Sequence, residues 1–116
     1  MKNKIIIIKK NRGNTRKICK TYQVTNFLTK EQCKNLSIAV SQARNHNEIT
    51  KNIKSDRVYY ILNGRLVVKQ GNKRIVAEKG DIIFIHQNTD YQFQGTFKAI
   101  LINSPAFRKE NEVSKL

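Results

Sequence analysis

Turn signals interrupt this chain at short and fairly regular intervals, and this spacing limits what it can fold into. Runs of β-branched and aromatic residues recur between turn signals at Asn63-Gly64, Gly71-Asn72, Lys79-Gly80-Asp81 and Gly95-Thr96. Strands separated by turns at roughly 8–12-residue spacing are typical of β-sandwiches and barrels. Helical periodicity is nearly absent, and only residues 29–35, with Thr29 as a cap, could form a helical turn. The sequence therefore predicts an all-β domain with at most one short helical turn.

Asn63-Gly64 is expected to reverse the chain between two strands. Asn-Gly suits the positive φ angles of a type I′ turn, so Val58–Leu62 and Arg65–Gln70 should form a hairpin. Ile82–Ile85 is apolar at every position, which is the pattern of a strand buried on both faces. The other expected strands are Ile5–Ile8, Arg16–Val24, Leu36–Val40, Lys73–Ala77, and the pair Tyr91–Gln94 and Phe97–Ile102 around Gly95-Thr96.

Length and composition indicate one small domain without a membrane segment. The chain has 116 residues, which is near the common size of a single domain. Its longest apolar runs, Ile5–Ile8 and Ile82–Ile85, are far shorter than the ~20 residues that span a bilayer. The first run is also shorter than the roughly 7–15 residues of a signal-peptide core. We therefore expect a cytoplasmic protein with no membrane partner.

Net charge is the unusual property of the composition. Lys and Arg number 23 against 8 Asp and Glu, and the first acidic residue along the chain is Glu31. A field of this sign favours anionic partners, such as phosphates or nucleic acid. The abundance of Lys, Asn and Ile is also typical of an AT-rich coding genome, in which lysine accumulates without a function. Both interpretations stay open at the level of sequence.

The stretch from Arg57 to Gly95 resembles the two-motif core of the cupin superfamily. Residues 58–64 (Val-Tyr-Tyr-Ile-Leu-Asn-Gly) are similar to the end of the first family motif, and Gly80-Asp81 is similar to the start of the second. The closing residues 104–107 are similar to the end of small single-domain, RmlC-like cupins. The resemblance implies a cupin-type jelly-roll β-barrel. Its core would be residues 36–107, with 1–35 as basic N-terminal strands of the same domain and 108–116 as a polar C-terminal tail.

The residues with which metal-binding cupins hold their ion are replaced in this sequence. By the resemblance, the family's ligand positions fall on Thr50 and Asn52 (or on the residue after each), Arg57 and Tyr91. Divalent first-row ions need imidazole, carboxylate or thiolate donors, which this set does not offer. The two histidines, His46 and His86, do not stand at a recognised ligand spacing from Glu48 or Asp90. We therefore expect no metal and no cofactor.

The resemblance also implies which side chains line the barrel. If Arg57 points inward as the family's glutamate does, Tyr59 does too by strand alternation. The predicted ligand-binding residues are Arg57, Tyr59, Tyr91, Phe93, Asn52, Thr50 and His86. Arginine binds carboxylates and phosphates bidentately, and tyrosines supply flat stacking surfaces. The expected function is therefore metal-independent binding of a small anionic or sugar-type ligand.

Three alternatives stay open at the level of sequence. Some metal-free cupins are sugar or nucleotide-sugar isomerases and epimerases, although no His–Asp doublet or carboxylate pair is visible in the expected pocket. The basic N-terminal region could bind nucleic acid. The third alternative is a structural module, in which Arg57 neutralises Asp56 or Asp90 and the aromatic rings fill the core. The expected oligomer is a homodimer, for which Ile5–Ile8 could pair with a second copy.

Overall fold

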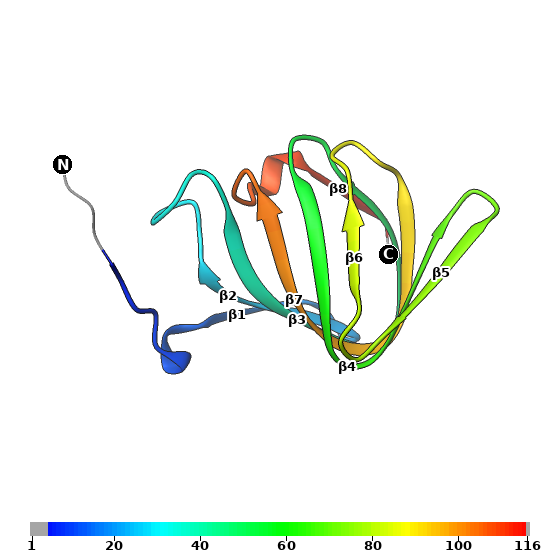
Figure 1. Ribbon diagram of the computed structural model, residues 1–116, viewed down its shortest axis with the longest axis horizontal. Helices are drawn as coiled ribbons and strands as arrows, with labels where there is room; N and C mark the ends of the chain where they lie inside the picture. The colour runs from blue at the N-terminus through cyan, green and yellow to red at the C-terminus, as the bar shows by residue number, and fades with distance from the viewer. Residues whose placement is uncertain (1–4, 116) are drawn as a thin grey trace.

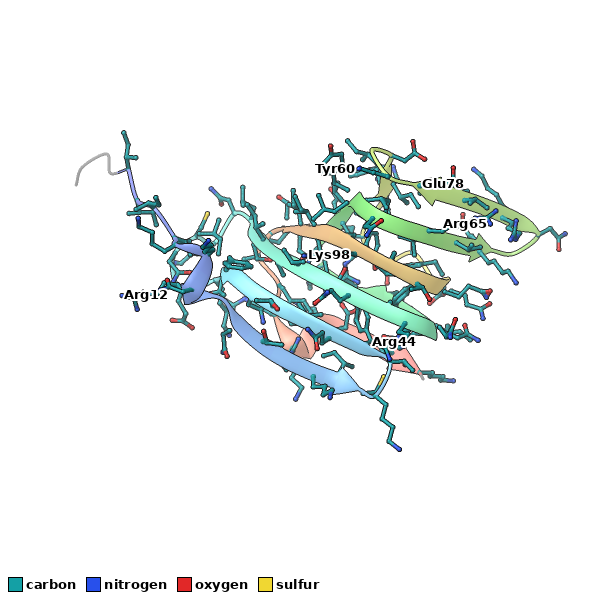
Figure 2. All side chains as sticks on the ribbon, turned by 90° about the horizontal axis from the view of Figure 1, so that it is seen from below. Arg12, Arg44, Tyr60, Arg65, Glu78 and Lys98 are labelled. Carbon is teal, nitrogen blue, oxygen red and sulfur yellow. The ribbon has the colours of Figure 1, made fainter. Side chains whose placement is uncertain are left out.

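The computed structural model describes residues 5–115, which fold into antiparallel strands and two short 3-10 turns. The elements are η1 (Lys10–Arg12), β1 (Asn14–Cys19), β2 (Tyr22–Leu28), β3 (Ser37–Asn52), β4 (Asp56–Gln70), β5 (Lys73–Glu78), β6 (Ile82–Ile85), β7 (Tyr91–Ser104), η2 (Lys109–Asn111) and β8 (Glu112–Lys115). The sheet order is β1-β2-β3-β7-β4-β5, while β6 pairs with β4 and β8 with β3. Figure 2 shows this order from below, and Figure 1 shows the strands curling into a barrel. The predicted all-β class is confirmed.

Three long strands, β3, β4 and β7, form the body of the barrel, and each bends near its middle. The bends fall at Asn45, Gly64 and Gly95, whose φ angles are 47°, 81° and 127°. The pairing registers place them close together, because His46 lies opposite Gly95 and Gly64 lies opposite Phe97. Register shifts in β3 and β4 accompany the bends. The sheet can therefore fold over without interrupting its strands, as the lower edge of the barrel in Figure 1 shows.

This geometry corrects two predicted reversals. Asn63-Gly64 does not close a hairpin, because β4 continues through it and pairs with β7 on both sides. Gly95-Thr96 likewise lies inside β7. The two strands approach so closely that a Cβ on Gly64 would meet the carbonyl oxygen of Thr96. A glycine with positive φ suits both a bend within a strand and a type I′ hairpin turn, so the local sequence does not separate them. The predicted turn at Gly71-Asn72, between β4 and β5, is confirmed.

Strand β6 was expected to be buried on both faces, and it is not. Ile83 and Ile85 are buried, whereas Ile82 and Phe84 are 64% and 52% exposed. β6 pairs with β4 and covers the barrel with one face only, so its other face points outward. On that outer face Tyr60 of β4 lies opposite Ile82. Uniform hydrophobicity thus marked an apolar outer surface rather than a doubly buried strand.

The N-terminal region also differs from the expected strands. Residues 5–8 form no strand, and Ile5, Ile6 and Ile7 are exposed. The expected strand 16–24 is two strands, because the chain reverses between β1 and β2. At residues 29–35 the Thr29 amide and hydroxyl both donate to Gln32 Oε1, which closes a single non-helical turn. The 3-10 turns of the described residues lie at η1 and η2 instead.

The C-terminal segment was expected to be a polar tail, but it completes the barrel wall. Its strand β8 pairs with β3, where Val113 lies opposite Lys51 and Ser114 opposite Thr50. The segment is held by Glu112, whose carboxylate forms an ion pair with Arg57. The tail prediction failed because that partner stands 55 residues earlier in the chain, where local composition cannot reveal it.

The barrel interior combines an apolar core with buried polar side chains. The most deeply buried apolar side chains are those of Tyr59, Ile61, Leu66, Phe93 and Ala99. The larger buried polar side chains include His46, Glu48, Asn52, Arg57 and Asn103. Buried polar groups require hydrogen-bond partners, and these side chains have them, within β3 for His46 and Glu48 and across strands for Asn52, Arg57 and Asn103. Within residues 5–115, no helix is long and apolar enough to cross a membrane.

Candidate functional site

A cavity of about 360 Å³ opens into the barrel between the β1–β2 hairpin and the inner faces of β3, β4 and β7. Small-molecule sites usually measure about 300–1,000 Å³, so this one suits a ligand of modest size. Its apolar lining includes Val24, Ala39, Phe93 and Leu101. Its polar lining includes Tyr22, Glu48, Arg57, Tyr59 and Asn103. An apolar enclosure with a few converging polar groups has the composition of a binding site.

Arg57 lies in the cavity wall, and protein groups already bind most of its guanidinium. Nη2 and Nη1 donate to the two carboxylate oxygens of Glu112, over 2.7 Å and 3.0 Å. Nε donates to Asn103 Oδ1 over 2.7 Å, and Nη1 also donates to the Tyr91 hydroxyl over 3.1 Å. The Arg57 side chain is only 4% exposed. The predicted partners Asp56 and Asp90 are not involved, so the charge of Arg57 is balanced by Glu112.

The Glu112 carboxylate is held from both sides. Thr50 Oγ1 donates to it over 2.9 Å and Asn52 Nδ2 over 3.0 Å. Burial alone would raise the pKa of Glu112, but the Arg57 guanidinium and these hydrogen bonds outweigh it and lower the pKa. Glu112 is therefore ionised at neutral pH, and its two oxygens form a bidentate ion pair with the buried Arg57 guanidinium.

Two buried tyrosines extend this network. The hydroxyls of Tyr59 and Tyr91 share a hydrogen bond of 2.7 Å. Burial raises the pKa of both phenols, because a phenolate is poorly solvated there. Charge repulsion from Tyr91 raises the pKa of Tyr59 further, and the nearby Arg57 cation lowers both pKa values by a smaller amount. Both hydroxyls therefore stay protonated at neutral pH. They can donate or accept a hydrogen bond, but they carry no charge.

A second polar pair, His46 and Glu48, lies deeper along β3. His46 Nε2 and Glu48 Oε1 are 2.7 Å apart, and both side chains are buried. The other ring nitrogen, Nδ1, lies 2.8 Å from the Thr21 hydroxyl. The imidazole stacks on the Tyr22 ring, with centroids 4.7 Å apart and planes at 12°. These contacts fix the ring, and the ring in turn fixes Glu48, which lines the cavity.

The structure separates the predicted ligand-binding residues into three groups. Arg57, Tyr59 and Phe93 line the cavity. Tyr91, Thr50 and Asn52 stand behind its wall and reach it through their hydrogen bonds to Arg57 and Glu112. His86 is exposed outside the barrel, where its ring packs edge-on against Phe84 with centroids 4.7 Å apart.

Four polar residues of the site were not among the predicted ligand-binding residues, although His46 and Glu48 had been considered as metal ligands: Tyr22, His46, Glu48 and Glu112. His46 and Glu48 are two apart on one strand, so alternation places them on the same face. That signal was readable once the strand was known to extend from residue 37 to 52. No local signal marks Glu112, because its role depends on a partner distant in sequence.

The donor set does not fit a metal. The positions of the family's ligands hold Thr50, Asn52, Arg57 and Tyr91, and the Arg57 guanidinium brings a fixed positive charge. Within residues 5–115, no three side chains of His, Cys, Asp or Glu are placed to hold an ion. The side chains that could act on a molecule in the cavity are therefore the carboxylate of Glu48, which His46 orients, and the neutral phenols of Tyr22 and Tyr59.

Comparison with solved structures places the fold among the cupins. A tyrosine-to-phenylalanine variant of Streptomyces PAC13 with uridine aligns with a TM-score of 0.82 and 18% identity, over 97% of this chain and 92% of that chain. KdgF from Halomonas sp. aligns with a TM-score of 0.76 and 13% identity, over 90% of this chain and 98% of that one. The Clostridium difficile EutQ protein aligns with a TM-score of 0.67 and 20% identity, over 73% and 63%. The predicted cupin-type jelly-roll barrel is thereby confirmed.

Sequence comparison identifies the family. No curated protein matches the chain significantly. A family model described as "Ethanolamine utilisation protein EutQ" matches residues 3–107. Because this match covers most of the chain and the barrel agrees with it, the chain belongs to the EutQ family of cupin-fold proteins.

Proposed function

We propose that the cavity binds a small sugar- or nucleoside-type molecule without a metal, and that Glu48 transfers a proton to or from it. One observation carries this proposal: a buried carboxylate lines the cavity and is oriented by a histidine 2.7 Å away. Buried ionisable pairs facing a cavity are characteristic of acid–base sites. A barrel that only dimerises has no need for such a pair beside a cavity.

The hydrogen bonds of the pair suit proton transfer. One histidine tautomer satisfies both contacts: Nε2–H donates to Glu48 Oε1, and the Thr21 hydroxyl donates to Nδ1. Among the described residues, no protein group hydrogen-bonds the second oxygen, Oε2, so a molecule in the cavity can approach it. Removing a proton next to a carbonyl would break a C–H bond and form an O–H bond on Oε2. The electron pair would pass to the carbonyl oxygen, where a neutral phenol can donate a hydrogen bond.

Aromatic side chains support a ring-shaped ligand. Tyr22 and Phe93 both line the cavity and meet edge to face, with centroids 5.4 Å apart. Tyr59 adds a hydroxyl that burial keeps protonated. Such surfaces stack on bases and on the apolar faces of sugars, while hydroxyls and carboxylates bind the ring's polar edge.

One structural relative, PAC13, supports this class of ligand. PAC13 is described as a nucleoside dehydratase, and its structures with uridine include variants that replace a histidine or a tyrosine. The same residue types stand around this cavity in His46, Tyr22 and Tyr59. Dehydration, isomerisation and epimerisation of sugars can all begin with removal of a carbon-bound proton. The family name adds ethanolamine metabolism as a biological setting.

The proposal is tested by separating binding from proton transfer. Uridine, simple aldoses and ethanolamine are titrated by calorimetry, and any ligand that binds is incubated in D₂O and followed by proton NMR. We expect deuterium to enter one carbon position of a carbonyl-containing ligand at a rate that Glu48→Gln reduces at least about 100-fold, the usual scale of acid–base catalysis. Binding itself should change little.

Two further variants complete the test. His46→Gln should also slow the exchange, because Glu48 loses its orienting partner. His86→Gln is the matched control, since His86 is exposed outside the cavity, and it should leave exchange and binding unchanged. Exchange that persists in Glu48→Gln, or failure of both uridine and the aldoses to bind, would reject the proposal.

A further inference from the structure

The mouth of the cavity is cationic, although its interior is not. Arg16 of β1 and Lys109 of η2 line the cavity together with Asn26 and Phe107, and the same four residues line a shallow depression beside it. The cavity therefore opens toward solvent between β1, β2 and the C-terminal segment. Both basic side chains are exposed at that opening.

These two cations are available to a ligand. Among residues 5–115, no carboxylate forms an ion pair with either of them, whereas the nearby Arg108 lies 3.7 Å from Glu110. The guanidinium of Arg16 lies 5.5 Å from the centre of the Phe107 ring, a cation–π contact that limits its movement. The depression adds Lys30 and a single carboxylate, that of Glu31. The opening thus carries an excess of positive charge.

The cavity interior has the opposite charge balance, with more acidic than basic side chains. Glu112 neutralises Arg57, and Glu48 adds a carboxylate beside His46. An anionic group is therefore unfavourable deep in the cavity and favourable at its mouth. The volume of about 360 Å³ also suits one sugar or nucleoside rather than a larger molecule.

We propose that the bound molecule carries a phosphate, which binds Arg16 and Lys109 at the mouth while its uncharged ring extends toward Glu48. The substrate class would be a sugar phosphate or nucleoside monophosphate. Arginine binds phosphate oxygens bidentately, and lysine adds a mobile point charge. The position of the ring rests on the function proposed above, whereas the phosphate site rests on the mouth alone.

Inorganic phosphate tests the mouth independently of any chemistry at Glu48. The protein is titrated with phosphate at constant ionic strength, and side-chain and backbone NMR signals are followed. Saturable shifts are expected at Arg16, Lys109 and Asn26. The double variant Arg16→Gln/Lys109→Gln should weaken phosphate binding at least about tenfold, whereas Glu48→Gln should leave it unchanged. Equal, non-saturating shifts of basic residues over the whole surface would overturn the inference.

The control removes the same number of charges elsewhere. Arg12 and Lys98 are exposed and lie outside the cavity lining, on η1 and β7 (Figure 2). Arg12→Gln/Lys98→Gln should bind phosphate like the wild type. If this control weakens binding as much as the Arg16/Lys109 variant, net charge alone explains the effect and the site does not exist.

A second comparison links the mouth to the interior. Uridine 5′-monophosphate should bind at least about tenfold more tightly than uridine, and the Arg16→Gln/Lys109→Gln variant should abolish that difference. Equal affinities for the two would overturn the phosphate site while leaving the proposed function in place. Saturable phosphate binding at Arg16 and Lys109 with no nucleoside or sugar binding would support the site and reject the proposed function.

Discussion

Replacing Glu112 with Gln should destabilise the fold more than any exposed charge does. The substitution leaves the Arg57 guanidinium buried, with Asn103 and Tyr91 as its remaining partners. Removing one partner of a buried ion pair costs about 3–5 kcal/mol. The Glu112 side chain is 19% exposed, so water can replace part of the lost charge. We therefore expect Glu112→Gln to lower the free energy of unfolding by about 2–3 kcal/mol.

Urea denaturation at pH 7, followed by circular dichroism, measures this loss. The matched control is Glu78→Gln, because Glu78 and Arg65 lie 3.9 Å apart with 62–69% of each side chain exposed. Both lie on the β4–β5 hairpin in Figure 2. An exposed pair contributes about 0–1 kcal/mol, so the control should remain within roughly 0.5 kcal/mol of the wild type. Equal effects of the two substitutions would refute the buried ion pair as the anchor of β8.

The same pair predicts a pH dependence. Arg57 lowers the pKa of Glu112 from its ordinary value of 4.5. The stabilisation is therefore complete above that value and is lost as the pH falls through the lower pKa of the folded state. The difference in unfolding free energy between the wild type and Glu112→Gln should shrink below pH 4.5. A difference that stays constant down to pH 2–3 would show that Glu112 acts through packing rather than charge.

Three further predictions concern the bends, the phenols and the outer face. Gly64→Ala should lose about 2–3 kcal/mol in urea denaturation, because its Cβ meets the Thr96 carbonyl oxygen. Gly71→Ala has nothing near its added Cβ and should lower the free energy of unfolding by only about 1 kcal/mol. Equal losses for the two variants would contradict the close approach of the strands at Gly64. Burial raises the pKa of Tyr22, Tyr59 and Tyr91, so stability should fall above pH 10.0, with these phenols ionising as the protein unfolds. Absorbance at 295 nm checks this in Tyr60→Phe, and ionisation without loss of circular dichroism would contradict it. We expect the homodimer to form through the exposed apolar face of β6, so Phe84→Lys should shift sedimentation from dimer to monomer, and a monomeric wild type at micromolar concentration would contradict this.

Local patterns were sufficient for the fold class. Turn residues at short spacing and runs of β-branched side chains depend on neighbours within a few residues, so they predicted an all-β domain and the β4–β5 turn at Gly71-Asn72, whereas the resemblance to the cupins implied the barrel. The same resemblance showed that Thr50, Asn52, Arg57 and Tyr91 stand where metal-binding cupins have their imidazole and carboxylate ligands. Alternation along β4 also placed Arg57 and Tyr59 on the inner face.

Only the tertiary structure decided whether a glycine reverses the chain or bends it. Gly64 and Gly95 provide positive φ in either case, and the partner strand beside them makes each a bend within a long strand. Only the tertiary structure likewise decided which charged side chains pair with each other. The role of Arg57 depends on Glu112, which a folded chain brings into contact from 55 residues away. Sequence determined which groups this barrel contains, but the pairing of distant strands determined which charges cancel inside it and which stay free at the mouth of the cavity.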